Sequence, residues 1–431
     1  MVEAAGGASP PPSIDCGGVL SPDTTRRPAI DSRGKTVLVL VFVFSLAGFL
    51  GTRYAASLQG SDFPDFYSAA RMLAEGHGHQ LYDAEVQRKY QARYAGRVGT
   101  LYIHPPFEAV VYLAVAWLPL RRAYLLWSLL NVAFLTVAAR RLTKEALISR
   151  DWRVLLAASL TFVPLLLCLL QGQDSLLLLL LVVLAFTALR RDRAFAAGCW
   201  LGLGLFKFQI VLPLVLVLVL TQSRNARNGL AQGFSLVVLA LAGLSAAISG
   251  WSVFTVYSGF LLHLQAQPFA GIMPRAMANL RGLVYFFSHT DGSSGAVAGV
   301  SMLSAAALIN TLTVWKRTRL APHLSEAIAS RDEFDLAFAN TVLFALLVSY
   351  HLNPHDLSIL LLPIPLLLHC MLTRTPRLTR VERWITAGSL GILFLPPLHL
   401  WTLKGIYAFV SLPMLALFLT SASLSRQSRT P

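Results

Sequence analysis

Long apolar runs separated by short polar linkers cover most of the chain from residue 36 onward. A membrane-spanning helix needs about 20 mostly apolar residues, and about 17 at the least. Most of the runs reach that length, and the pattern predicts an all-α, polytopic transmembrane protein. The runs lie at 36–52, 106–120, 121–141, 154–170, 174–189, 194–206, 208–222, 229–249, 293–315, 333–350, 356–372, 384–400 and 403–424.

Composition supports this class. Of the 431 residues, 55% are hydrophobic and only 13% are charged, and the mean hydropathy is +0.60. Soluble domains are about 25% charged. The net charge of +15 comes from Arg and Lys residues that stand singly or in twos and threes between apolar runs. This pattern argues against a nucleic-acid partner and favours loops that face the negatively charged cytoplasmic leaflet.

The distribution of basic residues predicts the topology. Both termini and five linkers hold 24 of the 36 Lys and Arg residues, although the two longest loops lie elsewhere. Placing this group in the cytoplasm predicts about twelve crossings. The run 106–120 then inserts only partly, and 194–222 enters and returns with a break near Lys207–Phe208. The five linkers are 140–153, 190–193, 222–229, 316–331 and 373–383.

This topology also divides the chain into regions. Residues 1–35 read as a disordered cytoplasmic tail, 36–424 as one transmembrane domain and 425–431 as a second cytoplasmic tail. The first outer loop, 53–105, carries short helices expected to lie in the membrane interface, and 250–292 forms a second large outer loop. Four polar clusters from distant segments, at 61–83, 171–175, 250–292 and 351–356, are therefore expected to meet on the outer face.

The first cluster is "SDFPDFYSAARMLAEG", directly after the first run. Pro64 suits the first turn of a helix that ends near Gly76, and Tyr67 falls on its apolar face. Asp62 could act as a general base at the membrane surface. The alternative is that Asp62 and Asp65 only cap the helix.

Two further candidate segments are "YIHPPFEAV" and the second of these clusters, "QGQDS". His104 and Glu108 place two titratable groups beside a Pro-Pro pair, unless the segment is only a structural turn. Gln173 and Asp174 lie in a connection too short for more than a tight turn. A carboxylate this close to hydrocarbon usually has a partner, although a polar turn at the headgroup level is the alternative.

The remaining candidates are basic or mixed. Lys207 interrupts an apolar stretch, where it could meet a lipid phosphate or reach to the surface. In "HLNPHD", His355 and Asp356 could relay a proton or recognise a phosphate. Arg281 in "MANLRGL" could bind a phosphate or a sugar. No spacing of ligands argues for a metal, and no nucleotide-binding or zinc motif is present, so a donor would have to come from the lipid phase.

Together these motifs resemble glycosyltransferase family 87 of the GT-C superfamily, over about residues 36–420. The resemblance rests on the order and spacing of "SDFPDFYSAARMLAEGHGHQLYD", "YIHPPFEAVVYLAVAWLPL", "GQDSLLLLLLVVLAFTALRRDRAFAAGCWLGLGLFKFQIVLPLVLVL" and "NPHDLSILLLPI". It implies a GT-C fold without a cofactor in a bacterial plasma membrane. It also implies transfer from a polyprenyl-phosphate sugar, typically mannose, to a lipid-linked or glycan acceptor on the extracytoplasmic face, among membrane lipids.

The resemblance also implies roles for individual residues. Asp62 looks like the general base of an inverting displacement, with Asp65 and His355 as runners-up. Tyr67, His104 and Glu108 would line the access of the acceptor. The chain has "HLNPHDLS" where mannosyltransferase members tend to have a Trp- and His-rich stretch, which leaves the sugar open. The donor phosphate or sugar would meet Lys207, Gln173, Arg281, His355 and Asp356.

A different class of function is also considered. A transporter or flippase of a lipid-linked or small polar substrate would predict inverted repeats between the two halves of the chain. The large outer loops follow the first and seventh predicted crossings, but their sequences do not match. A non-catalytic scaffold with the same fold would be expected to lack the acidic residue at position 62, which is present. The sequence therefore favours a glycosyltransferase.

Overall fold

The structure, a computed structural model, describes residues 58, 60–96, 98–146, 151–263, 273–289, 292–319, 327–373 and 378–427. Throughout these ranges it is all-helical, with no strand. The predicted tail 1–35, the first apolar run at 36–52 and residues 428–431 of the second tail lie outside the described residues.

The helices follow the order of the predicted runs. Those before residue 222 are α2 (Phe63–Ala74), η1 (Gly78–Gln80), α3 (Ala84–Ala95), α4 (Pro106–Ala116), α5 (Leu120–Ala146), α6 (Trp152–Ser159), α7 (Val163–Gln171), α8 (Ser175–Leu189), α9 (Ala194–Leu203), η2 (Gly204–Lys207) and α10 (Phe208–Thr221). Those after it are α11 (Arg224–Ser249), α12 (Val253–Leu262), η4 (Pro274–Ala276), α13 (Leu280–Ser288), α14 (Ser294–Arg319), α15 (Ala327–Val348), η5 (Pro354–Leu361), α16 (Pro363–Thr373), α17 (Arg380–Phe394), α18 (Pro396–Thr402), η6 (Tyr407–Val410) and α19 (Ser411–Gln427).

Several of these helices are long and apolar enough to cross a membrane. The described residues contain six, or eight if each of two bent pairs forms one span. The chain is therefore a multi-pass membrane protein. One of the twelve predicted crossings, 36–52, lies outside the described residues. The number is otherwise lower because Ala194–Thr221 counts as one span and because some predicted runs form short or charged helices. Helix α8 has only 15 residues, and the first turns of α15 carry Arg331, Asp332, Glu333 and Asp335.

Two predicted runs are bent instead of continuous. Helices α6 and α7, within the run 154–170, meet at 76°, and α17 and α18, within 384–400, meet at 78°. Pro164 and Pro396 stand in the first turns of α7 and α18. Proline fits a first turn because its missing N–H group has no helical partner there, and the residues that precede the two helices, Phe162 and Leu395, have extended backbones. The apolar pattern of the sequence does not reveal these bends, because the residues on both sides of each bend are apolar.

The packing of α9 against α11 indicates that α10 runs in the direction opposite to α9. A Cβ atom at Gly198 would lie 2.1 Å from the carbonyl oxygen of Leu230, and one at Gly202 would lie 2.7 Å from the Cβ of Val237. The two helices therefore run side by side in the same direction, in contact through small residues. Helix α11 begins three residues after α10 ends, so α10 returns to the level where α9 starts. This packing agrees with the predicted return at η2, while by length and composition alone Ala194–Thr221 counts as a single span.

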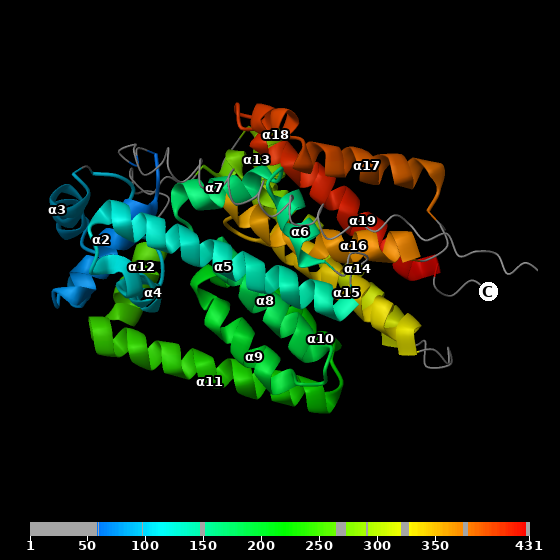
Figure 1. Cartoon of the computed structure of the whole chain (residues 1–431), viewed down its shortest axis with the longest axis horizontal. Helices are drawn as coiled ribbons and strands as arrows, with labels where there is room; N and C mark the ends of the chain where they lie inside the picture. Colours follow the sequence, from blue (N-terminus) through cyan, green and yellow to red (C-terminus); the bar gives the residue numbers. More distant parts are fainter. Residues whose placement is uncertain are drawn as a thin grey trace, which may run out of the picture.

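The short helices gather at one end of the molecule. Figure 1 shows α2, α3, α4 and α12 at the same end, while α5 and α11 run lengthwise away from it. The ring of Tyr82 packs against Tyr257 and Phe260 of α12, at centroid distances of 5.0 and 5.3 Å. The described parts of the two predicted outer loops, 53–105 and 250–292, thus pack on each other.

An aromatic core fixes α2 on the long helices. Phe66 stacks on Tyr112 of α4 at 4.6 Å, and Phe63 meets the edge of Tyr124 of α5 at 5.5 Å. Tyr112 in turn contacts Trp127 of α5 at 4.3 Å. All five side chains are buried, and aromatic pairs of this kind stabilise beyond their buried area. The amino-terminal end of α2, with Asp62, is therefore held at a fixed position against α5.

Candidate active site

The turn between α7 and α8 lies against the start of α2. Gly172 has a φ of +66°, and a Cβ atom there would lie 2.6 Å from the Cβ of Phe63. Glycine satisfies both the left-handed conformation and the close approach. Helix α5 holds this turn from the other side. Trp127 Nε1 donates to the carbonyl oxygen of Gly172 at 2.9 Å, and Asn131 Nδ2 donates to that of Gln173 at 3.1 Å.

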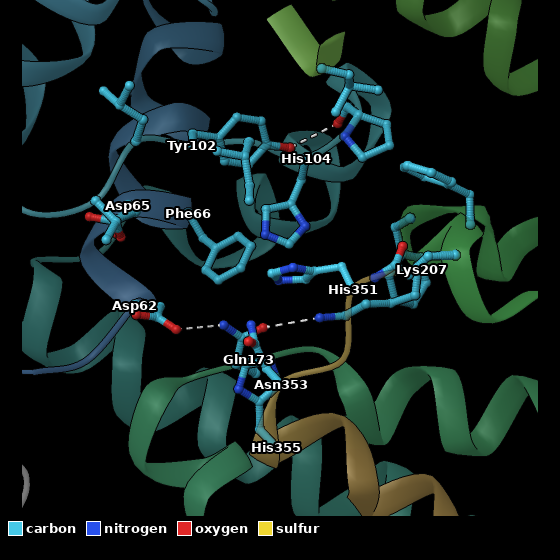
Figure 2. Close-up of a pocket in the computed structure, with 18 of the residues that line it drawn as sticks. Asp62, Asp65, Phe66, Tyr102, His104, Gln173, Lys207, His351, Asn353 and His355 are labelled. Carbon is cyan, nitrogen blue, oxygen red and sulfur yellow. Dashed lines mark hydrogen bonds between the residues drawn. The ribbon is translucent and has the colours of Figure 1, made fainter. Parts of the chain in front are cut away.

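Gln173, on this turn, joins two of the predicted clusters. Its Nε2 donates to Asp62 Oδ2 at 2.8 Å, and its Oε1 accepts from Lys207 Nζ at 3.2 Å. Figure 2 shows the two bonds in line, with Gln173 between the carboxylate and the ammonium. One side chain thus connects the start of α2 to the end of η2, over a sequence separation of more than 100 residues on the Asp62 side.

Lys207 lies in a buried ion cluster. Its Nζ is 3.3 Å from Asp174 Oδ1 and 3.2 Å from Asp356 Oδ1, and the residue is only 2% exposed. Ser175 Oγ donates to the same Asp356 oxygen at 2.9 Å. Because a buried charge is stable only when it is paired and hydrogen-bonded, this cluster explains how an ammonium is tolerated among apolar helices. It excludes the alternative that Lys207 reaches to the surface.

His104 and Glu108 form a pair beside this cluster. His104 Nδ1 is 2.9 Å from Glu108 Oε2, and Glu108 is fully buried. The imidazole also packs on the ring of Phe66 at 4.8 Å. Burial lowers the pKa of His104 to about 4, so that its ring is neutral at pH 7. Burial raises the pKa of Asp174 to about 7, which leaves this carboxyl able to bind a proton near neutral pH.

The "HLNPHD" segment completes the site from the carboxyl end of α15. His355 Nδ1 lies 2.5 Å from Gln171 Oε1, so the α7–α8 turn contacts this segment too. Asp356 closes a capping box with Asn353, whose backbone N–H donates to Asp356 Oδ2 at 2.9 Å. Burial lowers the pKa of His351 to about 4. Both histidines and the asparagine face the same space as Lys207 in Figure 2.

These side chains line a cavity of about 290 Å³, close to the lower limit for a ligand pocket. The predicted convergence of the four polar clusters is therefore confirmed, with Tyr257 and Leu261 as the contribution of 250–292, while the outer face as its location stays a prediction. The predicted site residues in its wall are Asp62, Asp65, His104, Gln173, Lys207 and His355.

Other predicted residues lie outside the cavity. Glu108 and Asp356 contact His104 and Lys207 from behind. Tyr67 is not part of the cavity wall, and its hydroxyl donates to the carbonyl oxygen of Leu118 in the α4–α5 connection. Arg281 does not face the cavity either. Its guanidinium stacks 3.9 Å from the ring centre of Tyr350 and donates to that residue's carbonyl oxygen, so it orders a residue of the wall.

The two aspartates of α2 have different surroundings. Asp65 accepts hydrogen bonds from Gln91 Nε2, at 3.1 Å, and from Thr100 Oγ1, which ties α2 to α3 and to the segment after it. Asp62 is the residue before α2, but within the described chain its side chain makes no capping bond to that helix. It is directed toward Gln173 instead. Capping alone therefore does not explain Asp62.

The sequence did not point to several residues of the wall. Tyr257 and Leu261 come from α12, and Phe206 and Phe208 flank Lys207. Tyr257 donates its hydroxyl to the carbonyl oxygen of Ile103 at 3.3 Å. These residues have no signal in the sequence because they are apolar or aromatic residues in apolar helices. In the described ranges, no group of three or more His, Cys, Asp or Glu side chains is arranged to hold a metal ion.

Comparison with known proteins gives the family. The profile of glycosyltransferase family 87 matches residues 102–349, which is more than half of the chain. The matched range contains Gln173 and Lys207, while Asp62 precedes it and His355 follows it. No curated protein and no solved structure matches the chain. The chain belongs to glycosyltransferase family 87, and it is a membrane-bound sugar transferase.

Proposed function

We propose that this enzyme transfers a sugar, with mannose as the first choice, from a polyprenyl phosphate to a hydroxyl group of a lipid-linked or glycan acceptor. The reaction would take place on the extracytoplasmic face of the plasma membrane, with Asp62 as the general base. One observation carries the proposal: Asp62 stands in the wall of a cavity and accepts a hydrogen bond from Gln173, which also binds the buried cation Lys207.

The geometry supports a single inverting displacement. Asp62 would take the proton of the acceptor hydroxyl as its oxygen attacks the anomeric carbon. The bond from this carbon to the phosphate oxygen breaks, and the polyprenyl phosphate leaves with the electron pair. Positive charge from Lys207 in the cavity wall would stabilise the negative charge of the leaving phosphate. Since acceptor and leaving group occupy opposite faces of the sugar, its configuration inverts.

The test is transfer by purified protein reconstituted in lipid. Wild type and Asp62→Asn would receive radiolabelled polyprenyl-phosphate mannose and extracted membrane lipids. We expect transfer by the wild type and a loss of about 10²- to 10⁴-fold in the variant, with donor binding retained. Asp83→Asn is the matched control. Asp83 caps α3 through the backbone N–H groups of Glu85 and Val86, a role that asparagine fills equally well.

Each other outcome has a defined meaning. Activity that survives Asp62→Asn would leave the enzyme in place and move the base to Asp65 or His355. Absence of transfer from mannose, glucose and arabinose donors, with folded protein, would contradict the proposed donor. A product with retained anomeric configuration would contradict the single displacement.

A further inference from the structure

The chemistry of Lys207 fixes the orientation of the Gln173 amide. An ammonium group has three donors and no acceptor, so the amide atom at 3.2 Å from Lys207 Nζ must be the oxygen. The nitrogen therefore faces Asp62 Oδ2 at 2.8 Å and donates to it. The chain of donation runs in one direction only, from Lys207 through Gln173 to Asp62. Reversal of the amide would place N–H groups against an ammonium.

Both ends of this amide are bound within the protein. Gln173 is 3% exposed, and its backbone carbonyl accepts from Asn131 on α5. Its side chain thus has a fixed place between two charged groups, because neither the turn nor the amide can rotate without losing these bonds. This arrangement differs from the role that the family resemblance implies, in which Gln173 binds the donor.

We propose that Gln173 is a positioning residue that transmits the positive charge of Lys207 to Asp62 and keeps this carboxylate ionised and aimed into the cavity. The proposal rests on the proposed function in that it takes Asp62 to be the base. A hydrogen bond to a charged group is stronger than one between neutral groups, and polarisation by the ammonium strengthens it further in a low-dielectric site.

Other ionisable groups face the same link and will contribute to any pH profile. They come from the segment before α4 and its first turn, from the α7–α8 turn, from the connection between α15 and η5, and from η5 itself. These groups are His104, Glu108, Asp174, His351, His355 and Asp356. A change in pH dependence is therefore informative only as a difference between variants that leave all six in place.

The kinetic test uses Gln173→Met, which keeps the length of the side chain and removes both hydrogen bonds. Gln173→Glu keeps an acceptor for Lys207 and removes the donor to Asp62. Because kcat reports positioning of the base, we expect it to fall about 10- to 100-fold in both variants, with the KM for the polyprenyl-phosphate donor nearly unchanged. The acidic limb of the kcat/KM profile should move to higher pH. Gln232→Met, on the exposed side of α11, is the control and should match wild type.

A second readout does not depend on transfer. The infrared difference between wild type and Asp62→Asn isolates the carboxylate stretching band of Asp62. The pH at which half of this carboxylate is protonated, its midpoint, is then measured in the same way in protein that also carries Gln173→Met. We expect the midpoint to rise by about one unit or more. If wild type transfers no sugar, the proposed function fails, while the infrared midpoint still decides the link between Gln173 and Asp62.

Two results would overturn the inference. An unchanged midpoint would show that Gln173 does not stabilise the ionised carboxylate. A rise in donor KM with kcat and the acidic limb unchanged would make Gln173 a ligand of the donor instead. Should Gln173→Met fail to fold, Gln173→Leu supplies the same readouts, because it is also uncharged and also lacks both hydrogen-bonding groups.

Discussion

Lys207 shows why a buried charge needs more than one partner. Its ammonium has three donors, and the structure places three acceptors around it: Gln173, Asp174 and Asp356. Removing an ion from water costs several kcal/mol, which the partners offset only when the geometry is good. The cluster ties η2, the α7–α8 turn and η5 together, so the same residues that form the cavity wall also stabilise the fold there.

Removal of the Lys207 ammonium should therefore destabilise the folded protein. We expect Lys207→Met to lower the free energy of unfolding by about 3–5 kcal/mol, because it leaves two carboxyl groups buried without their partner. The double variant Lys207→Met/Asp174→Asn removes one of them and should lose less than the sum of the single changes. Denaturant unfolding in detergent gives the free energy of unfolding of wild type, of both single variants and of the double variant. If the losses in stability simply add, the two residues are not directly coupled.

His104 predicts a pH effect with a definite sign. Its pKa is about 4 in the folded chain, compared with about 6.5 in an unfolded one. Between these values the unfolded state binds more protons, so the neutral imidazole stabilises the fold above about pH 6.5 and loses this contribution as pH falls toward 4. The melting temperature of wild type should fall more steeply over this window than that of His104→Gln. Parallel curves would contradict a buried neutral ring.

At the level of elements, the α7–α8 turn organises the site. The polar side chains of "QGQDS" contact three other parts of the site, namely the start of α2, η2 and η5. Gln171 meets His355, Gln173 joins Asp62 to Lys207, and Ser175 donates to Asp356. The sequence identified this stretch as a tight polar turn at the membrane surface. Its contacts with α2 and η5 arise from the packing of helices that are distant in the chain.

The turn depends on its glycine. Gly172→Ala would place a side chain in the left-handed region and against Phe63, and we expect a loss of about 2–4 kcal/mol in stability with at least a 10-fold loss of transfer. Gly243→Ala is the control, because Gly243 is exposed on α11 with open space around its Cα. It should leave activity intact and stabilise by up to about 1 kcal/mol. Equal behaviour of the two variants would contradict the packing argument.

For the whole molecule, the outer surface of the bundle fits a membrane. The span windows of α11 and α14 are only 17% buried within the protein, and large apolar residues such as Leu239 and Met302 are exposed on them. Such faces are stable against lipid and would be unfavourable in water. The short helices α2, α3 and α12 at one end then lie beside the cavity, near one surface of the membrane.

The side on which this end lies can be measured. With the four native cysteines replaced, Lys89→Cys on α3 and Asn225→Cys on α11 would each carry one exposed thiol. We expect an impermeant maleimide to label position 89 in intact cells and position 225 only after permeabilisation, because the basic linker 222–229 favours the cytoplasm. Labelling of both from outside would contradict the topology, and the reverse pattern would move the cavity to the cytoplasmic face.

Local composition and order are enough to predict the class of the protein and most of the segments that form its site. Apolar runs of span length predict a helical membrane protein because lipid cannot satisfy backbone polar groups. Rare charged residues within such runs are costly, so Lys207 and Asp174 already stood out as functional candidates. These conclusions follow from local composition and order, and the family match to residues 102–349 agrees with them.

Only the tertiary structure decided which of these residues meet. Tyr67 and Arg281 had the right chemistry and segments, yet packing turns them away from the cavity, toward Leu118 and Tyr350. Tyr257 had no chemical signal and lies in the wall because α12 packs on the first outer loop.

Contacts between distant side chains depend on how helices pack, on bends such as that at Pro164 and on close approaches such as that at Gly172. The link from Lys207 through Gln173 to Asp62 is of this kind, because it exists only where three separate segments meet.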